Sequence, residues 1–300
     1  MPPRVSRIST SADLLGESPV WDSERQRLYW VDGVSRRVRS YEPASGVTCD
    51  WNVPSTIGSV ALGQDETLVV ALVDGIYRLD LTSGAVTPLF RPEPADPRVR
   101  LNDGKMDRFG RFLCGSMGVH ADPLGRLYRI DASGKGTELA QGIRIANTLC
   151  FSPDGATLYF ADSLDRAIRA YRYGPGEGEL GAPRILVDTV PYGSGPDGAT
   201  VDADGCLWVA LVQVGKIARF TPDGALDRLI DAPTDLPSCM AFGGADLSTL
   251  YVTSIKDSGS GRAISRHPDG GFLFAIHGLG VTGLPEPRFG QASAPAMSVS

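Results

Sequence analysis

Six short apolar triplets recur along the chain at separations of 40, 44, 46, 49 and 43 residues. They are 28–30 (LYW), 68–70 (LVV), 112–114 (FLC), 158–160 (LYF), 207–209 (LWV) and 250–252 (LYV). A period of this length is typical of propellers and solenoids, in which each repeat is one small supersecondary unit that buries its apolar faces against its neighbours. The repeat therefore restricts the chain to a radial or linear array of six units.

Within a unit, an apolar strand and a turn such as 152–155 (SPDG) precede the triplet, and a third strand follows it in most units, as at 75–80, 126–131 and 216–220. No segment carries a capped helical pattern. Short strands without helices, repeated six times, predict an all-β, six-bladed β-propeller. We expect residues 1–300 to form a single domain. A sandwich or two stacked small barrels would also be all-β, but neither requires the long period.

A closed ring of blades leaves no exposed sheet edge, and the last unit includes the apolar run 271–276. We therefore expect the N-terminal segment from Arg4 to Ser9 to pair into the last blade. The 36 glycines and 22 prolines are spread along the chain rather than gathered in one tract, as many tight turns between short strands require.

Polar residues recur at similar offsets before the triplets. Glu17 and Asn147 lie eleven residues before a triplet, and Asn102 and Asp197 lie ten before. Equivalent positions of a radial repeat converge at one mouth of the channel, where clustered carboxylates and amides would raise one another's pKa or require a cation. Oxygen donors without histidine suit Ca²⁺, Mg²⁺ or Mn²⁺ and also permit Zn²⁺. The alternative is that these residues cap inner strands or bind channel water. The other two units offer Ile57 or Gly58 and Ser238 or Cys239, which are weak ligands.

Several motifs together resemble the senescence-marker protein, regucalcin and gluconolactonase family. They are 16–21 (GESPVW), 100–105 (RLNDGK), 196–198 (PDG), 242–244 (FGG) and 277–283 (HGLGVTG), and the resemblance runs from about residue 14 to 290. It implies a six-bladed propeller with one divalent metal held by Glu17, Asn147 and Asp197. It also implies substrate contacts from Arg100 and Asn102, with Asp103 close to the metal.

One position departs from the family. Some members carry an acidic substrate contact shortly after the segment that matches 115–117, and the aligned residue here is His120. We take His120 as a candidate substrate-binding residue, with a solvated loop position as the alternative. Arg100 likewise has an alternative as a surface ion-pair residue.

The resulting hypothesis is a metal-dependent hydrolase that opens a sugar-acid lactone, either an aldonolactone or an aldarolactone, to the free acid. The metal is Ca²⁺ or Zn²⁺, with Mn²⁺, Mg²⁺ and Fe²⁺ also compatible, and Asp197 or Asp103 accepts the proton of the attacking water. Two alternatives remain at this point. The chain could hydrolyse another ester-like bond, such as an organophosphate, or bind calcium without catalysis.

Other classes of function fit the sequence poorly. The net charge of −6 and the lack of basic runs argue against nucleic acid, and no stretch approaches the ~20 apolar residues of a membrane span. The N-terminus has no apolar signal-peptide region, so we expect a cytoplasmic protein. Three histidines without a GxSxG motif argue against a serine hydrolase, and five scattered cysteines form no CxxC pair. The oligomeric state is left open.

Overall fold

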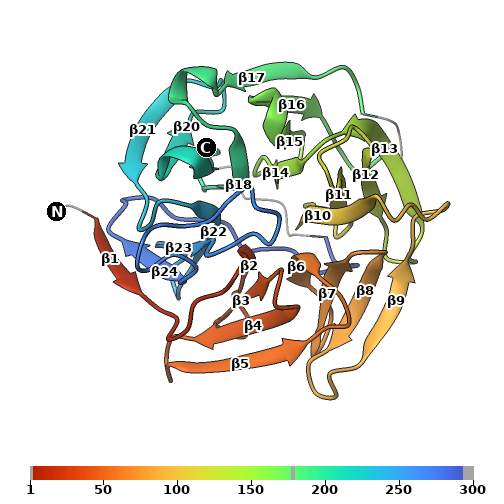
Figure 1. Ribbon diagram of the computed structural model, residues 1–300, viewed down its shortest axis with the longest axis horizontal. Helices are drawn as coiled ribbons and strands as arrows, with labels where there is room; N and C mark the ends of the chain where they lie inside the picture. Colours follow the sequence, from red (N-terminus) through yellow and green to blue (C-terminus); the bar gives the residue numbers. More distant parts are fainter. Residues whose placement is uncertain (1–2, 177–179, 293–300) are drawn as a thin grey trace.

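The computed structural model of the protein describes residues 3–176 and 180–292. These residues form six four-stranded antiparallel sheets around a common axis, with β2, β6, β10, β14, β18 and β22 innermost (Figure 1). The prediction of an all-β, six-bladed propeller is confirmed. Its extent as a single domain over residues 1–300 stays a prediction, because residues 1–2, 177–179 and 293–300 lie outside the described part.

The strands are assigned to blades in chain order. Blades 1 and 2 consist of β2–β5 (Gly16–Asp22, Arg27–Asp32, Arg37–Glu42 and Val47–Asn52) and β6–β9 (Ile57–Leu62, Thr67–Leu72, Ile76–Asp80 and Val86–Phe90). Blades 3 and 4 consist of β10–β13 (Val99–Met106, Phe112–Gly118, Gly125–Ile130 and Gly136–Ile143) and β14–β17 (Ala146–Phe151, Thr157–Asp162, Ala167–Arg172 and Arg184–Asp188). Blade 5 consists of β18–β21 (Pro196–Val201, Leu207–Leu211, Lys216–Phe220 and Leu226–Asp231), and blade 6 of β22–β24 (Pro237–Gly243, Thr249–Ser254 and Phe274–His277) with β1 (Arg4–Arg7).

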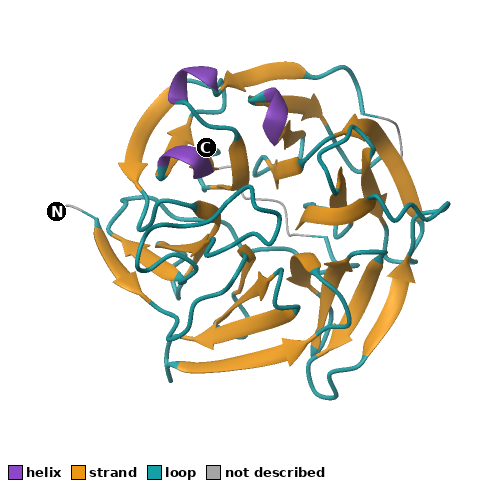
Figure 2. Ribbon diagram, viewed as in Figure 1, coloured by secondary structure: helices purple, strands orange, loops and turns teal. Residues whose placement is uncertain are grey.

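Helical structure in the described residues is limited to three short 3₁₀ turns on blades 4 and 5 (Figure 2). They are η1 (Ser163–Asp165), η2 (Val190–Tyr192) and η3 (Val212–Val214). None of the helical segments in the described residues has the length and apolar character that a membrane-spanning helix requires.

Each apolar triplet lies in the second strand of a blade, and its first residue is at most 1% exposed in all six blades. Side chains along a strand alternate between the two faces of a sheet, and both faces of a blade pack against neighbours. In β3, Tyr29 and Val31 join a core with blade 2, whereas Leu28 and Trp30 join a core with blade 6. Burial on both faces explains why the triplets are continuously apolar instead of alternating.

The ring is closed by the first strand. β1 pairs antiparallel with β24 and becomes the outermost strand of blade 6, with Val5 opposite Ile276. The predicted pairing of the N-terminal segment is confirmed. Blade 6 therefore combines strands from both ends of the described chain, and β1 covers the outer edge of β24.

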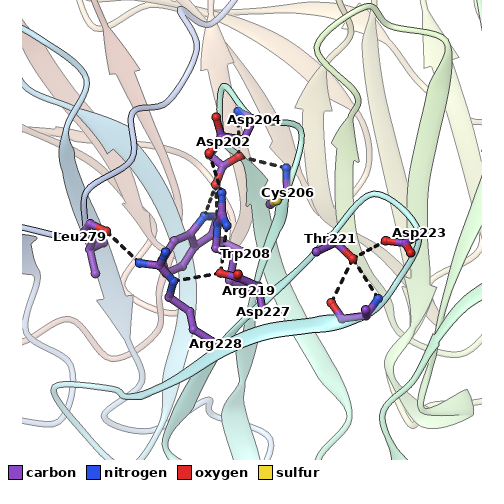
Figure 3. Close-up of polar contacts among 11 residues, drawn as sticks. Asp202, Asp204, Cys206, Trp208, Arg219, Thr221, Asp223, Asp227, Arg228 and Leu279 are labelled. Atoms are coloured by element: carbon purple, nitrogen blue, oxygen red, sulfur yellow. Dashed lines mark hydrogen bonds and ion pairs between the residues drawn. The ribbon is translucent and has the colours of Figure 1, made fainter.

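A buried polar network stabilises blade 5 (Figure 3). The Asp202 carboxylate accepts hydrogen bonds from Trp208 Nε1 and Arg219 Nε, both at 2.8 Å. Arg219 also pairs with Asp227 at 2.9 Å, which in turn pairs with Arg228 at 3.0 Å. The Asp202 side chain is fully buried and that of Arg219 is 7% exposed. Blade 1 has a similar arrangement: Trp30 and Arg39 lie opposite each other on the second and third strands, and both donate to the Asp13 carboxylate.

We predict that Arg219→Ala lowers the free energy of unfolding by about 3 kcal/mol or more, because the buried Asp202 carboxylate loses the one charged partner that it has among the described residues. Arg228→Ala is the matched control, since Arg228 also contacts Asp227 and Trp208 but is partly exposed, and it should cost less than about 1 kcal/mol. Chemical denaturation measures both. Equal losses for the two variants would contradict the buried-pair interpretation.

Candidate metal and substrate site

A β-bulge interrupts every inner strand close to its start. In five blades two inner-strand residues oppose a single residue of the second strand, and in β6 the extra residue is one glycine. The bulges are Ser18 and Pro19, Gly58, Asn102 and Asp103, Thr148 and Leu149, Asp197 and Gly198, and Ser238 and Cys239. A bulge breaks the alternation of side chains and re-aims them. All six bulges lie near the start of their inner strands, and those of blades 1, 4 and 5 carry or adjoin the predicted ligands Glu17, Asn147 and Asp197.

The structure corrects the prediction that the polar residues share one repeat position. Glu17 and Asn147 still pair with the second strand and directly precede the bulge, whereas Asn102 and Asp197 are the first residues of the bulge itself. All four lie within inner strands rather than before them. The offsets of eleven and ten residues thus mark two adjacent positions. Both positions reach the axis because of the bulge.

Two hydroxyl residues with left-handed backbone follow the ligand candidates of the first position. Ser18 has φ 49° and Thr148 has φ 58°. A left-handed backbone is uncommon outside glycine, and especially so for a β-branched residue such as Thr148. Thr148 Oγ1 donates to the carbonyl of Asp197 at 2.6 Å, and Ser18 Oγ accepts from Val60 N at 3.0 Å. Each hydroxyl therefore ties its own inner strand to the inner strand of the next blade and holds the bulge in place.

A chain of hydrogen bonds joins the predicted substrate residues to a predicted ligand. Arg100 Nη1 donates to Asn102 Oδ1 at 2.8 Å. Asn102 Nδ2 donates to Asn147 Oδ1 at 3.1 Å and to the carbonyl of Ala146 at 2.9 Å. Blades 3 and 4 thus present Arg100, Asn102 and Asn147 as one connected group.

Three carboxylates lie close enough in this group to influence one another. Burial raises the pKa of Glu17 well above its ordinary value, and the charges of Asp197 and Asp103 raise it further. Burial raises the pKa of Asp197 to about 8, with Asp103 as the neighbouring charge. Burial also raises the pKa of Asp103 to about 6, although the Leu149 amide donates to its Oδ2 at 2.9 Å. Crowded carboxylates of this kind favour a bound cation.

The donor set fits a hard or borderline divalent ion. Glu17, Asp103 and Asp197 take part in no ion pair within the described part of the chain. The charges of Arg100 and Lys105 act only from a distance, on Glu17 and on Asp103 respectively. The described residues include no three His, Cys, Asp or Glu side chains placed to hold a metal together. A metal here would require the Asn147 amide beside the carboxylates of Glu17 and Asp197, which is the set that the sequence predicts.

Lys105, a buried cation beside Asp103, forms its ion pair with another segment. A narrow cavity beside Asp103 is also lined by Ser18, Cys239, Lys105 and Glu286. Lys105 Nζ lies 2.6 Å from Glu286 Oε1, and the two side chains are 15% and 10% exposed. The ion pair of Lys105 is therefore with the C-terminal segment, and its charge lowers the pKa of Asp103 without outweighing the effect of burial.

Comparison with known proteins decides the family. The model of the SMP-30/gluconolactonase/LRE-like region matches residues 15–256. The chain belongs to this family. The 6-deoxy-6-sulfogluconolactonase of Pseudomonas putida is 36% identical over 279 residues, which cover 92% of this chain and 95% of that protein. The L-arabinolactonase of Azospirillum brasilense is 35% identical over 276 residues, covering 90% and 91%.

A solved member of the family superposes closely. The crystal structure of a calcium-binding protein, regucalcin, from Agrobacterium tumefaciens gives a TM-score of 0.88 at 30% identity and covers 94% of this chain and 96% of that one. The family resemblance predicted from the sequence motifs is confirmed.

His120 stands apart from the other predicted residues of this SMP-30/gluconolactonase member. It is exposed in the turn after β11, and no hydrogen bond or ion pair in the described residues links it to them. Arg100 pairs with Met117 near the end of that strand, so the turn lies at the same end of the blade as the site. Its role as a substrate contact stays a prediction.

The sequence did not predict the hydroxyl residues that hydrogen-bond to the inner strands and to Asn147 in this family member. A signal existed for two of them, because Glu17 and Asn147 are each followed by a hydroxyl residue, Ser18 and Thr148. Ser163, which accepts from Asn147 Nδ2 at 2.9 Å, lies sixteen residues away and carried no such signal.

We predict that Gly58→Ala disturbs the site from the neighbouring blade. A Cβ at Gly58 would lie 2.4 Å from the carbonyl oxygen of Asn102 and 2.7 Å from its Cα, so β10 must shift. Overpacking of this kind costs about 1–3 kcal/mol of stability, and turnover should fall as Asn102 moves. Gly174→Ala is the control, because its Cβ meets no atom within 4 Å. Wild-type stability and turnover in Gly58→Ala would show that the close approach has no consequence.

Proposed function

We propose that this protein is a lactonase that hydrolyses a sugar-acid lactone, an aldonolactone or an aldarolactone, to the free acid with one divalent metal. The observation that carries the proposal is the group of buried carboxylates without ion pairs, together with amides, at the inner-strand bulges. Relatives named as sugar lactonases cover nearly the whole chain, which supports the same reaction class.

Glu17, Asn147 and Asp197 would hold the metal. Bound there, a divalent ion would polarise the lactone carbonyl and lower the pKa of a coordinated water. The relative described as calcium-binding supports Ca²⁺. The all-oxygen donor set also accepts Zn²⁺, Mn²⁺, Mg²⁺ or Fe²⁺, so metal identity is a matter for titration.

The chain's own residues supply a base and a substrate cradle. Asp103 or Asp197 would accept the proton of the attacking water. Arg100 would bind a substrate oxygen, because Nη1 donates only to the neutral carbonyl of Leu101 and to Asn102 Oδ1, and no carboxylate pairs with it in the described structure. A guanidinium has five donors, so several remain for a ligand. Asn102 would orient sugar hydroxyls beside it, and His120 would reach the substrate from the rim.

Metal removal is the first test. Chelation should abolish hydrolysis of the preferred lactone in a panel of aldono- and aldarolactones, and one divalent ion should restore it, as read by a pH indicator. Asp197→Ala should keep the wild-type melting temperature and lose activity even with metal in excess. A metal-binding wild type that hydrolyses none of the lactones would instead favour the calcium-binding or other-ester alternatives.

Arg100→Met should raise KM and lower kcat/KM by roughly ten- to a hundredfold, because a hydrogen bond from a charged donor contributes about 1.5–3 kcal/mol. Arg98→Met is the matched control two residues away, since Arg98 is exposed and paired with Asp96 at 2.7 Å. Steady-state kinetics on both variants measure the difference. Equal kcat/KM for the two variants would remove Arg100 from the substrate site.

A further inference from the structure

The side-chain amide of Asn147 is held at both ends. Its Nδ2 donates to Ser163 Oγ at 2.9 Å, and its Oδ1 accepts from Asn102 Nδ2 at 3.1 Å. Ser163 is the first residue of η1, directly after β15, and is half-buried. The two contacts lie on opposite sides of the amide, so together they set which end faces the proposed metal.

The Ser163 hydroxyl fixes the NH₂ end of the amide, and Asn102 holds the oxygen end. A hydroxyl has one hydrogen to donate, and Ser163 Oγ donates it to the carbonyl of Pro196 at 2.7 Å, a group that can only accept. Towards Asn147 the hydroxyl therefore acts as an acceptor. It accepts from the NH₂ end of the amide, and the carboxamide oxygen must point away from Ser163. An amide turned by 180° would set two acceptors against each other.

Blade 1 is the matching case in which the ligand candidate has no amide to orient. The residue equivalent to Ser163 is Gly33: its N–H donates to Leu15 at 2.8 Å, as that of Ser163 donates to Ile145 at 3.0 Å. The ligand candidate of blade 1 is Glu17, whose two carboxylate oxygens are chemically identical. The blade with a symmetric ligand has no hydroxyl at this position, and the blade with an asymmetric amide has one.

We propose that Ser163 is a positioning residue of the metal site, which fixes the Asn147 carboxamide oxygen toward the ion and joins β14 to the ligand strand β18. This inference rests on the proposed metal site. It concerns a residue that touches neither ion nor substrate, since its hydroxyl is engaged by Asn147 and Pro196.

A double-mutant cycle with Asn147→Asp tests the orientation directly. Ser163→Ala should weaken metal binding to the chelator-treated protein roughly 10- to 100-fold, the effect typical of losing a partner of a ligand. With Asn147→Asp in place the ligand is symmetric, and Ser163→Ala should then change the dissociation constant by less than about twofold. Calorimetric titration with Ca²⁺ and with Zn²⁺ measures all four proteins, and Ser163→Thr should restore binding by restoring the hydroxyl.

Thr148→Val is the matched control for a purely structural effect. It removes another hydroxyl that ties β14 to β18, at 2.6 Å from the Asp197 carbonyl, without touching the Asn147 amide. Its effect should be the same with Asn147 and with Asp at that position. A Ser163→Ala loss that persists in the Asn147→Asp background, or no loss at all in a wild type that binds metal, overturns the inference. A wild type that binds no divalent ion overturns the proposed metal site and this role with it.

Discussion

Burial of both faces of every blade is the constraint on which this molecule depends. The second strands are apolar on both sides because each sheet packs between two others, so polar side chains reach a common space only along the axis. A regular inner strand would direct its side chains alternately into the interfaces with the two neighbouring blades. The bulges at the start of the inner strands relieve this conflict, because they turn adjacent residues such as Asn102 and Asp103 away from strict alternation.

The sequence predicted the fold well because two-sided burial leaves a direct trace, the continuous triplets at a constant period. It predicted the site less completely. Counting residues back from each triplet selected Glu17 and Asp197 as ligand candidates, but it treated two adjacent positions of the inner strand as one. The reason is that a bulge adds a residue without changing the local composition. The sequence did not predict the contact of Ser163 with Asn147 or the Lys105–Glu286 ion pair. Each contact joins residues that are distant in sequence, and no local pattern encodes such a contact.

Blades 1 and 4, three repeat steps apart, hold their ligand candidates in the same way. Asp32 closes β3 and accepts from the amides of Leu14 and Leu15, and Asp162 closes β15 and accepts from those of Arg144 and Ile145. Each aspartate fixes the chain just before it enters the inner strand. The two blades therefore present Glu17 and Asn147 from opposite sides of the ring with similar backbone support, and they differ in what orients the ligand candidate.

The two remaining bulges bear on how the donor set can change over evolution. Blade 2 is closed to new donors, because any side chain at Gly58 would collide with the backbone of Asn102. Blade 6 is open: Cys239 occupies its bulge and already lines the cavity beside Asp103. If the proposed site came to bind a softer ion, the bulge of blade 6 is therefore where a sulfur ligand already stands, while the other blades would keep their packing unchanged.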